Sequence, residues 1–213
     1  MRAQTHVRIA FGNLPLKSPP PPEKTLGAPI DVTGLKAPLM VVATLTTEGV
    51  TTRTFAIVPT ITVNADNTAN VTPLTNAVAA LVAPSGNLDS LLVPATLGAS
   101  TMAQNVSNAT ALIVNTLTAD TAVNTSLGAN FNPLTTPFTA DGTGVDAVLD
   151  KLSIEVSANG VSVTNHAAPV AEGAVQQATT LSAAQTATPT IVPTLPASTP
   201  TLVPERQELG LEQ

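Results

Sequence analysis

The chain of 213 residues contains no Cys, no Trp and no Tyr, and only four Phe. The lack of Cys excludes disulfides, thiol nucleophiles and thiolate metal sites. The lack of Trp and Tyr argues against a platform on which nucleic-acid bases or sugar rings would stack. Because aromatic side chains bury the most apolar area per residue, the core has to be assembled from many smaller side chains, chiefly Ala, Val and Leu.

Charge is scarce as well. The 8 Lys and Arg and 14 Asp and Glu give a net charge of −6, and between Asn76 and Ala140 only Asp89 and Asp120 are charged. Thr, Asn, Ser and Gln must therefore cover the surface of that region, a composition common in exported bacterial proteins. Scattered basic residues on an acidic chain form no phosphate-binding patch, so we expect no nucleic-acid partner.

Long apolar runs are missing. Uninterrupted stretches such as residues 77–83 are far shorter than the roughly 20 residues of a transmembrane helix, so we expect no membrane span. No apolar segment follows Arg2 to form the central part of a signal peptide. We interpret this start either as that of a cytoplasmic protein or as one that is not the biological start.

The composition divides the chain into four segments: a leader or linker over 1–36, a β-strand region over 37–71, a helical region over 72–165 and a tail over 166–213. The leader contains the run Pro19–Pro22, which is stiff and cannot pair inside a sheet, so we expect the leader to be disordered. Recurrent Pro in the tail excludes a helix or a central strand. We expect a disordered or extended tail that serves as a linker or as a surface stalk.

The strand region contains two apolar, β-branched runs at 39–45 and 54–58, with a turn at Glu48–Gly49 between them. A shorter pair of strands is predicted at 61–63 and 69–71. These strands are too few to close a sheet by themselves. We therefore interpret them as the last strands of a β-sandwich that begins upstream.

The hydrophobic period changes at Thr72. Thr72 is a good N-cap, Pro73 suits the first helical position, and the apolar residues that follow recur on one helical face. Further helices are predicted over 88–93 and 100–117. The first helix has the face Leu74, Ala77, Val78, Leu81 and Val82, and the helix over 100–117 has the face Met102, Val106, Ala109, Ile113 and Leu117.

The region ends in a short helix and a hairpin. Phe131 and Phe138 are expected to fill the helical core, and Thr143 begins the short helix with Asp146 at the capping-box position. Asn159–Gly160 is predicted as a two-residue type I′ turn, because both of its central residues need positive φ. In that register the apolar residues of the hairpin share one face: Ile154, Val156, Ala158, Val161 and Val163.

Candidate catalytic residues are few. The two histidines, His6 and His166, lie in the leader and just beyond the hairpin. A catalytic triad holds its His rigidly between two partners, and neither position favours that. Two isolated His without Cys also do not make a zinc site. We interpret both as surface or loop residues and assign no catalytic residue and no cofactor.

The most prominent motif runs from Asp141 to Asp146, with the sequence Asp-Gly-Thr-Gly-Val-Asp. It lacks the Asp-Thr-Gly of aspartic proteases, the alternating oxygen ligands and closing Glu of a calcium loop, and the Lys of a phosphate loop. We interpret it as a tight glycine turn that caps the helix after it. A weak cation site at Asp141 and Asp146 is the alternative.

Two segments, Asn70–Asn76 and Phe131–Asp150, resemble segments of uncharacterised proteobacterial lipoproteins and secreted proteins. In that family a carboxypeptidase-regulatory-like β-sandwich precedes a small helical region that ends in a hairpin, and the resemblance covers about residues 37–165. It supplies no catalytic residue. It implies a secreted or cell-envelope location, although the family's signal peptide, frequent lipid-attached Cys and complete sandwich have no counterpart at the front of this chain, which suggests a truncated or mis-assigned start.

These observations predict an α+β fold with a few antiparallel β-strands in a partial sandwich, a cluster of three or four helices, a terminal hairpin and disordered ends. The expected function is that of a non-catalytic structural or interaction module of a bacterial secreted or cell-envelope protein, with a cell-surface or protein partner. A binding module for a small ligand or a surface polymer is the alternative. A hydrolase, with Asp141 or Asp146 beside a second carboxylate or His166, is the third hypothesis.

Overall fold

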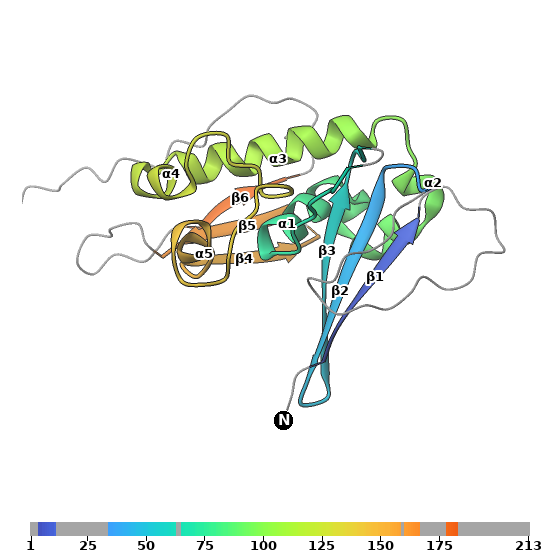
Figure 1. Cartoon of the computed structure of the whole chain (residues 1–213), viewed down its shortest axis with the longest axis horizontal. Coiled ribbons are helices and arrows are strands. Elements are labelled where there is room, and N and C mark those ends of the chain that lie inside the picture. The colour runs from blue at the N-terminus through green and yellow to red at the C-terminus, as the bar shows by residue number, and fades with distance from the viewer. Residues whose placement is uncertain (1–3, 12–33, 63–64, 159, 167–177, 183–213) are drawn as a thin grey trace, which may run out of the picture.

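A computed structural model describes residues 4–11, 34–62, 65–158, 160–166 and 178–182. This part of the chain forms two antiparallel three-stranded sheets and five α-helices, which confirms the α+β class (Figure 1). Sheet A has the order β1–β2–β3 and sheet B the order β4–β5–β6. The strands are β1 (Gln4–Phe11), β2 (Leu39–Thr47), β3 (Val50–Val58), β4 (Leu152–Ser157), β5 (Gly160–Asn165) and β6 (Ala178–Leu181). The helices are α1 (Pro73–Val82), α2 (Pro94–Leu97), α3 (Met102–Thr118), α4 (Thr121–Leu127) and α5 (Gly144–Leu149), with the 3₁₀ helices η1 (Pro84–Gly86) and η2 (Leu88–Leu92) between α1 and α2.

Helix α1 lies between the two sheets and contacts β3 on one side, β4 and β5 on the other, and α3 (Figure 1). Its start is as predicted, because the Thr72 hydroxyl accepts from the Thr75 backbone N–H and the Thr75 hydroxyl accepts from the Thr72 N–H. Seven of its ten residues are buried, so the apolar surface is wider than the single face predicted. A helix that is apolar almost all round belongs in the interior.

One apolar cluster runs from sheet A through the helices to sheet B. Met40 and Ile57 of sheet A and Val161 and Leu181 of sheet B are each at most 1% exposed and belong to this cluster. The boundary proposed at residues 71 and 72 therefore does not separate two hydrophobic cores. In the described part of the chain, α1 and not a second sheet packs on this face of sheet A.

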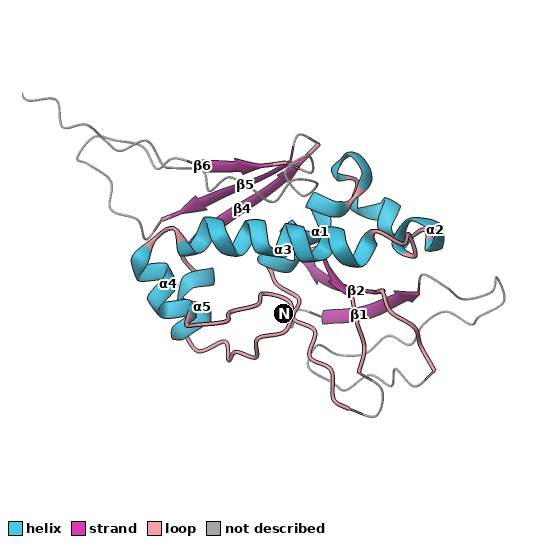
Figure 2. Ribbon diagram, turned by 90° about the horizontal axis from the view of Figure 1, so that it is seen from above, coloured by secondary structure: helices cyan, strands magenta, loops and turns pink. Residues whose placement is uncertain are grey.

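Helix α3 covers α1 (Figure 2), and its buried residues are the five predicted from the sequence. Helix α4 was not predicted. Its N-cap is Asp120, whose carboxylate accepts from the N–H groups of Ala122 and Val123, and Gly128 ends it with a φ of 76°. Both residues are ordinary helix-boundary signals, so a search for caps alone would have found this helix.

Two expectations about the ends of the chain are wrong. Strand β1 lies in the segment expected to be disordered leader, and it pairs antiparallel with β2 from Gln4 opposite Thr46 to Phe11 opposite Leu39. Strand β6 lies in the expected disordered tail and pairs with β5. Strand β1 is the outer strand of sheet A next to β2, and β6 is the outer strand of sheet B next to β5. Residues 12–33, with the proline run, and residues 167–177 and 183–213 of the tail lie outside the described residues.

Four smaller expectations also need correction. The described residues of 61–71 form no strands, and the Asn67 side chain instead bonds the backbone of Thr62. The hairpin of sheet B closes at Ser157 opposite Gly160, one residue earlier than predicted. Val163 therefore lies opposite Ile154 and not opposite Val156, as the predicted turn required, but the apolar residues of the two strands keep a common face. Asn159 itself and Val63 lie outside the described residues.

Of the two Phe expected in the helical core, Phe131 is buried, and Phe138 is only half-buried. The segment 88–93 is mostly a 3₁₀ helix, η2.

Candidate functional site

The β2–β3 hairpin projects from the body of the molecule (Figure 1). Its base packs on α1, but from Leu45 to Arg53 every residue is exposed. The turn residues Glu48 and Gly49 both have positive φ, at 53° and 81°, as the two central residues of a type I′ turn require. Because sheet A continues past the helices, this end has solvent on both faces.

Besides Glu48, Gly49 and Arg53, the exposed residues of the projecting hairpin are four Thr and two apolar residues. Leu45 is 42% exposed and Val50 is 68% exposed, and they are two of the three large exposed apolar residues in the described part of the chain. Both lie on the face of sheet A that points away from α1, in line with the buried Leu39 and Val41 at the base. An apolar row thus runs from a buried cluster to an exposed tip. Exposed apolar surface that is continuous in this way is typical of contact surfaces.

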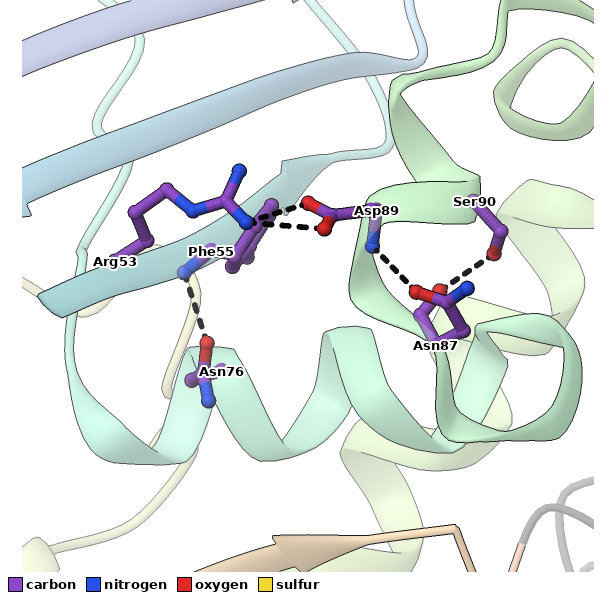
Figure 3. A network of polar contacts seen from close by, with 6 residues as sticks. All are labelled: Arg53, Phe55, Asn76, Asn87, Asp89 and Ser90. Carbon is purple, nitrogen blue, oxygen red and sulfur yellow. Dashed lines mark hydrogen bonds and ion pairs between the residues drawn. The ribbon is translucent and has the colours of Figure 1, made fainter.

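A polar network at the base of the hairpin holds it against the helices (Figure 3). Arg53 forms an ion pair with Asp89 of η2 at 2.8 Å and lies over the ring of Phe55, with 5.4 Å from the guanidinium carbon to the ring centroid. The Phe55 backbone N–H donates to Oδ1 of Asn76 in α1 at 2.9 Å. The ion pair is half-exposed and contributes only about 0–1 kcal/mol, so its main effect is to fix the orientation of β3.

Of the candidate cation ligands, Asp141 lies on the exposed loop before α5, and Asp146 lies half-buried in the first turn of α5. Asp141 accepts from the Thr143 hydroxyl at 2.7 Å and from the Thr143 N–H at 3.0 Å, and Asp146 accepts from the Gly142 N–H at 2.7 Å. Both carboxylates thus bind their own loop, as a structural turn does. The capping box differs from the prediction, since the Thr143 hydroxyl turns back to Asp141 and Asp146 bonds Gly142 in place of Thr143.

The hydrogen bonds from Thr143, first from its hydroxyl and then from its N–H, lower the pKa of Asp141. A lowered pKa in the folded state stabilises the loop above the ordinary Asp pKa, and this contribution is lost as the pH falls through the folded pKa. We expect Thr143→Val to move the pKa of Asp141 back toward its ordinary value, without restoring it fully because the N–H bond remains. A carboxyl ¹³C NMR titration measures this, with Thr135→Val, in a different turn, as the control. An unchanged pKa in Thr143→Val would contradict the assignment.

The two histidines belong to different parts of the fold, His6 to sheet A and His166 to the end of β5 in sheet B. The His166 Nε2 lies 2.7 Å from the Ser153 Oγ, and its backbone N–H donates to the Lys151 carbonyl at 2.8 Å. His166 is exposed at the end of β5, and His6 lies in β1 opposite Thr44. Among the described residues, no group of three or more His, Asp or Glu converges as a metal site requires.

The Asn side chains of this Asn-rich chain mainly complete the backbone. Asn70 donates to the carbonyls of Pro133 and Thr136, Asn132 accepts from the Leu134 N–H, and Asn87 accepts from the Asp89 N–H. Asn67 and Asn76 do the same for Thr62 and Phe55. These Asn therefore replace missing secondary-structure hydrogen bonds and do not converge on a shared ligand position.

Comparisons with protein-family models, with curated proteins and with solved structures find no match for this chain. Within the described residues, the helices are all too short or too polar to cross a membrane.

Proposed function

We propose that this chain is a non-catalytic structural or interaction module of a bacterial secreted or cell-envelope protein, and that the exposed end of the β2–β3 hairpin is its contact surface. The single observation that carries the interaction role is the apolar row that continues from the buried Val41 to the exposed Leu45 and Val50. The fixed base supports the same role, because a surface held rigidly loses little conformational entropy on binding.

The non-catalytic part of the proposal is supported by the hydrogen-bond partners of the polar side chains. Asp141, Asp146 and the Asn residues bind nearby backbone, and this is how groups that stabilise a fold are used. The exported location is supported by the sparse charge of the surface and by the sequence resemblance. A protein partner fits an exposed strand edge with apolar side chains better than a sugar polymer does, since no Trp or Tyr is present to stack on sugars.

The test uses the full chain in the organism that encodes it. A photo-crosslinking amino acid at Val50 is expected to give one discrete adduct in the envelope or secreted fraction. The same residue at Asn115, exposed on α3, is the control and is expected to give none. A chain found only in the cytosol would overturn the location, and the absence of an adduct from Val50 would overturn the contact surface.

A further inference from the structure

Among the residues that the structure describes, the backbone N–H and C=O groups on the outer edge of β3 have no hydrogen-bond partner before Phe55. In an antiparallel pair, alternate residues turn their N–H and C=O groups toward the same neighbour. The Phe55 N–H points away from β2, since it donates to Asn76. Arg53 and Thr51 are two and four residues before Phe55, respectively, and therefore present their N–H and C=O groups to the same side. Within the described residues, β3 is the last strand of sheet A on that side.

Such an edge selects its partner by chemistry. Backbone groups spaced two residues apart are matched by another extended strand, the mode known as β-strand addition. Asn76 occupies the edge at Phe55, so the open length is short, from Val50 to Thr54. Proteins usually protect an open edge with Pro, a bulge or an unpaired charge. Here the one charge of the stretch, Arg53, is already paired with Asp89.

The open stretch is complementary to itself. In an antiparallel pair of two β3 strands with a two-fold axis at Thr52, Thr51 of each copy exchanges backbone hydrogen bonds with Arg53 of the other. No like charges then lie directly opposite each other, and Val50 lies opposite Thr54. Leu45 of β2 lies opposite Thr52 of β3 within each copy. Since the two Thr52 lie opposite each other in the pair, the two Leu45 and the two Thr52 form one row across the joined sheet, on the face away from α1.

We infer that the partner of the hairpin is a second copy of this chain, joined edge to edge through β3 into one continuous six-stranded sheet. This inference rests on the proposed function and names its partner. The β-branched residues of the stretch favour the extended conformation that the pairing needs. Edge pairing over so short a stretch covers much less than the about 1,200 Å² of stable complexes, so the dimer is weak and forms at high local concentration.

Thr52 allows a charge-swap test of both the partner and the register. Thr52 is exposed, and the two-fold axis places it opposite its own copy. Thr52→Glu alone and Thr52→Lys alone are expected to weaken self-association of the full chain by up to about fivefold, because like charges lie opposite each other. An equimolar mixture of the two variants is expected to associate at least as well as the wild type. Sedimentation equilibrium measures all three, and far-UV circular dichroism checks that each variant is folded.

The matched control is the same charge pair at Thr47, which is exposed on the hairpin but lies in β2, away from the edge. A mixture of the Thr52 variants that associates no better than either alone, or a wild type that stays monomeric at about 1 mM, overturns the inference. The Val50 cross-link separates the two proposals. An adduct of twice the chain mass supports both, an adduct with a different protein overturns the dimer and leaves the contact surface, and no adduct overturns both.

Discussion

Replacing Leu81 by Ala is expected to lower the free energy of unfolding by about 2–5 kcal/mol, the range for Leu→Ala in a closed core. Leu81 is 1% exposed, and α1 contacts β3, β4, β5 and α3, so the cavity would lie where both sheets meet the helices. Ala is a better helix former than Leu, so the loss cannot come from helix propensity. It would measure packing on α1 alone.

Urea unfolding followed by far-UV circular dichroism measures this change, since the chain has no Trp or Tyr for fluorescence. The control is Leu45→Ala, the same substitution at a residue that is 42% exposed, with an expected change within about 0.5 kcal/mol. Both variants should unfold in one transition, because one apolar cluster joins the two sheets. A loss below about 1 kcal/mol for Leu81→Ala would mean that the centre of the molecule can collapse around the cavity.

Replacing Gly160 by Ala is expected to detach β6 from sheet B. Gly160 has a φ of 131°, and a Cβ there would overlap the backbone carbonyl oxygen of Leu181. Backbone cannot rotate away as a side chain can, so β6 must move. The unfavourable φ alone costs about 1–3 kcal/mol. The loss of pairing between β5 and β6 adds to that cost.

Gly49→Ala is the control for Gly160→Ala. Gly49 also has positive φ, at 81°, but a Cβ there meets no atom within 4 Å, so only backbone strain is added. Hydrogen exchange over residues 178–182 should lose protection in Gly160→Ala and keep it in Gly49→Ala. Equal protection in the two variants would contradict the close approach of β6 to Gly160.

Elements with local signals were predicted well, and elements that depend on distant partners were not. Thr72 and Pro73 mark the start of α1 within the sequence, and the apolar spacing of α3 identified each of its buried residues. In strand β1 the large apolar residues Val7, Ile9 and Phe11 alternate with His6, Arg8 and the small Ala10, which is a local strand signal. Strand β6 has only four residues, too few for a periodic pattern, and it exists because β5 offers an edge.

The candidate site was beyond prediction for a related reason. The turn at Glu48–Gly49 and its flanking strands were readable from the sequence. That these strands extend past α1, so that Leu45 and Val50 are exposed while Leu39 and Val41 are buried, depends on the size of the helical layer. The predicted glycine turn at Asp141–Asp146 depended only on local chemistry. In the structure residues 140–143 form a bend and α5 begins at Gly144.

The position of α1 between the two sheets has a consequence for synthesis on the ribosome. Sheet A is encoded before α1, but β5 ends at residue 165, which is 165 − 82 = 83 residues after α1 ends. At a synthesis rate of about 5–20 residues per second, roughly 4–17 s pass between the end of α1 and the end of β5. Throughout that time the apolar side of α1 that packs on β4 and β5 is uncovered. During that interval the nascent chain is the form of this protein most in need of a chaperone.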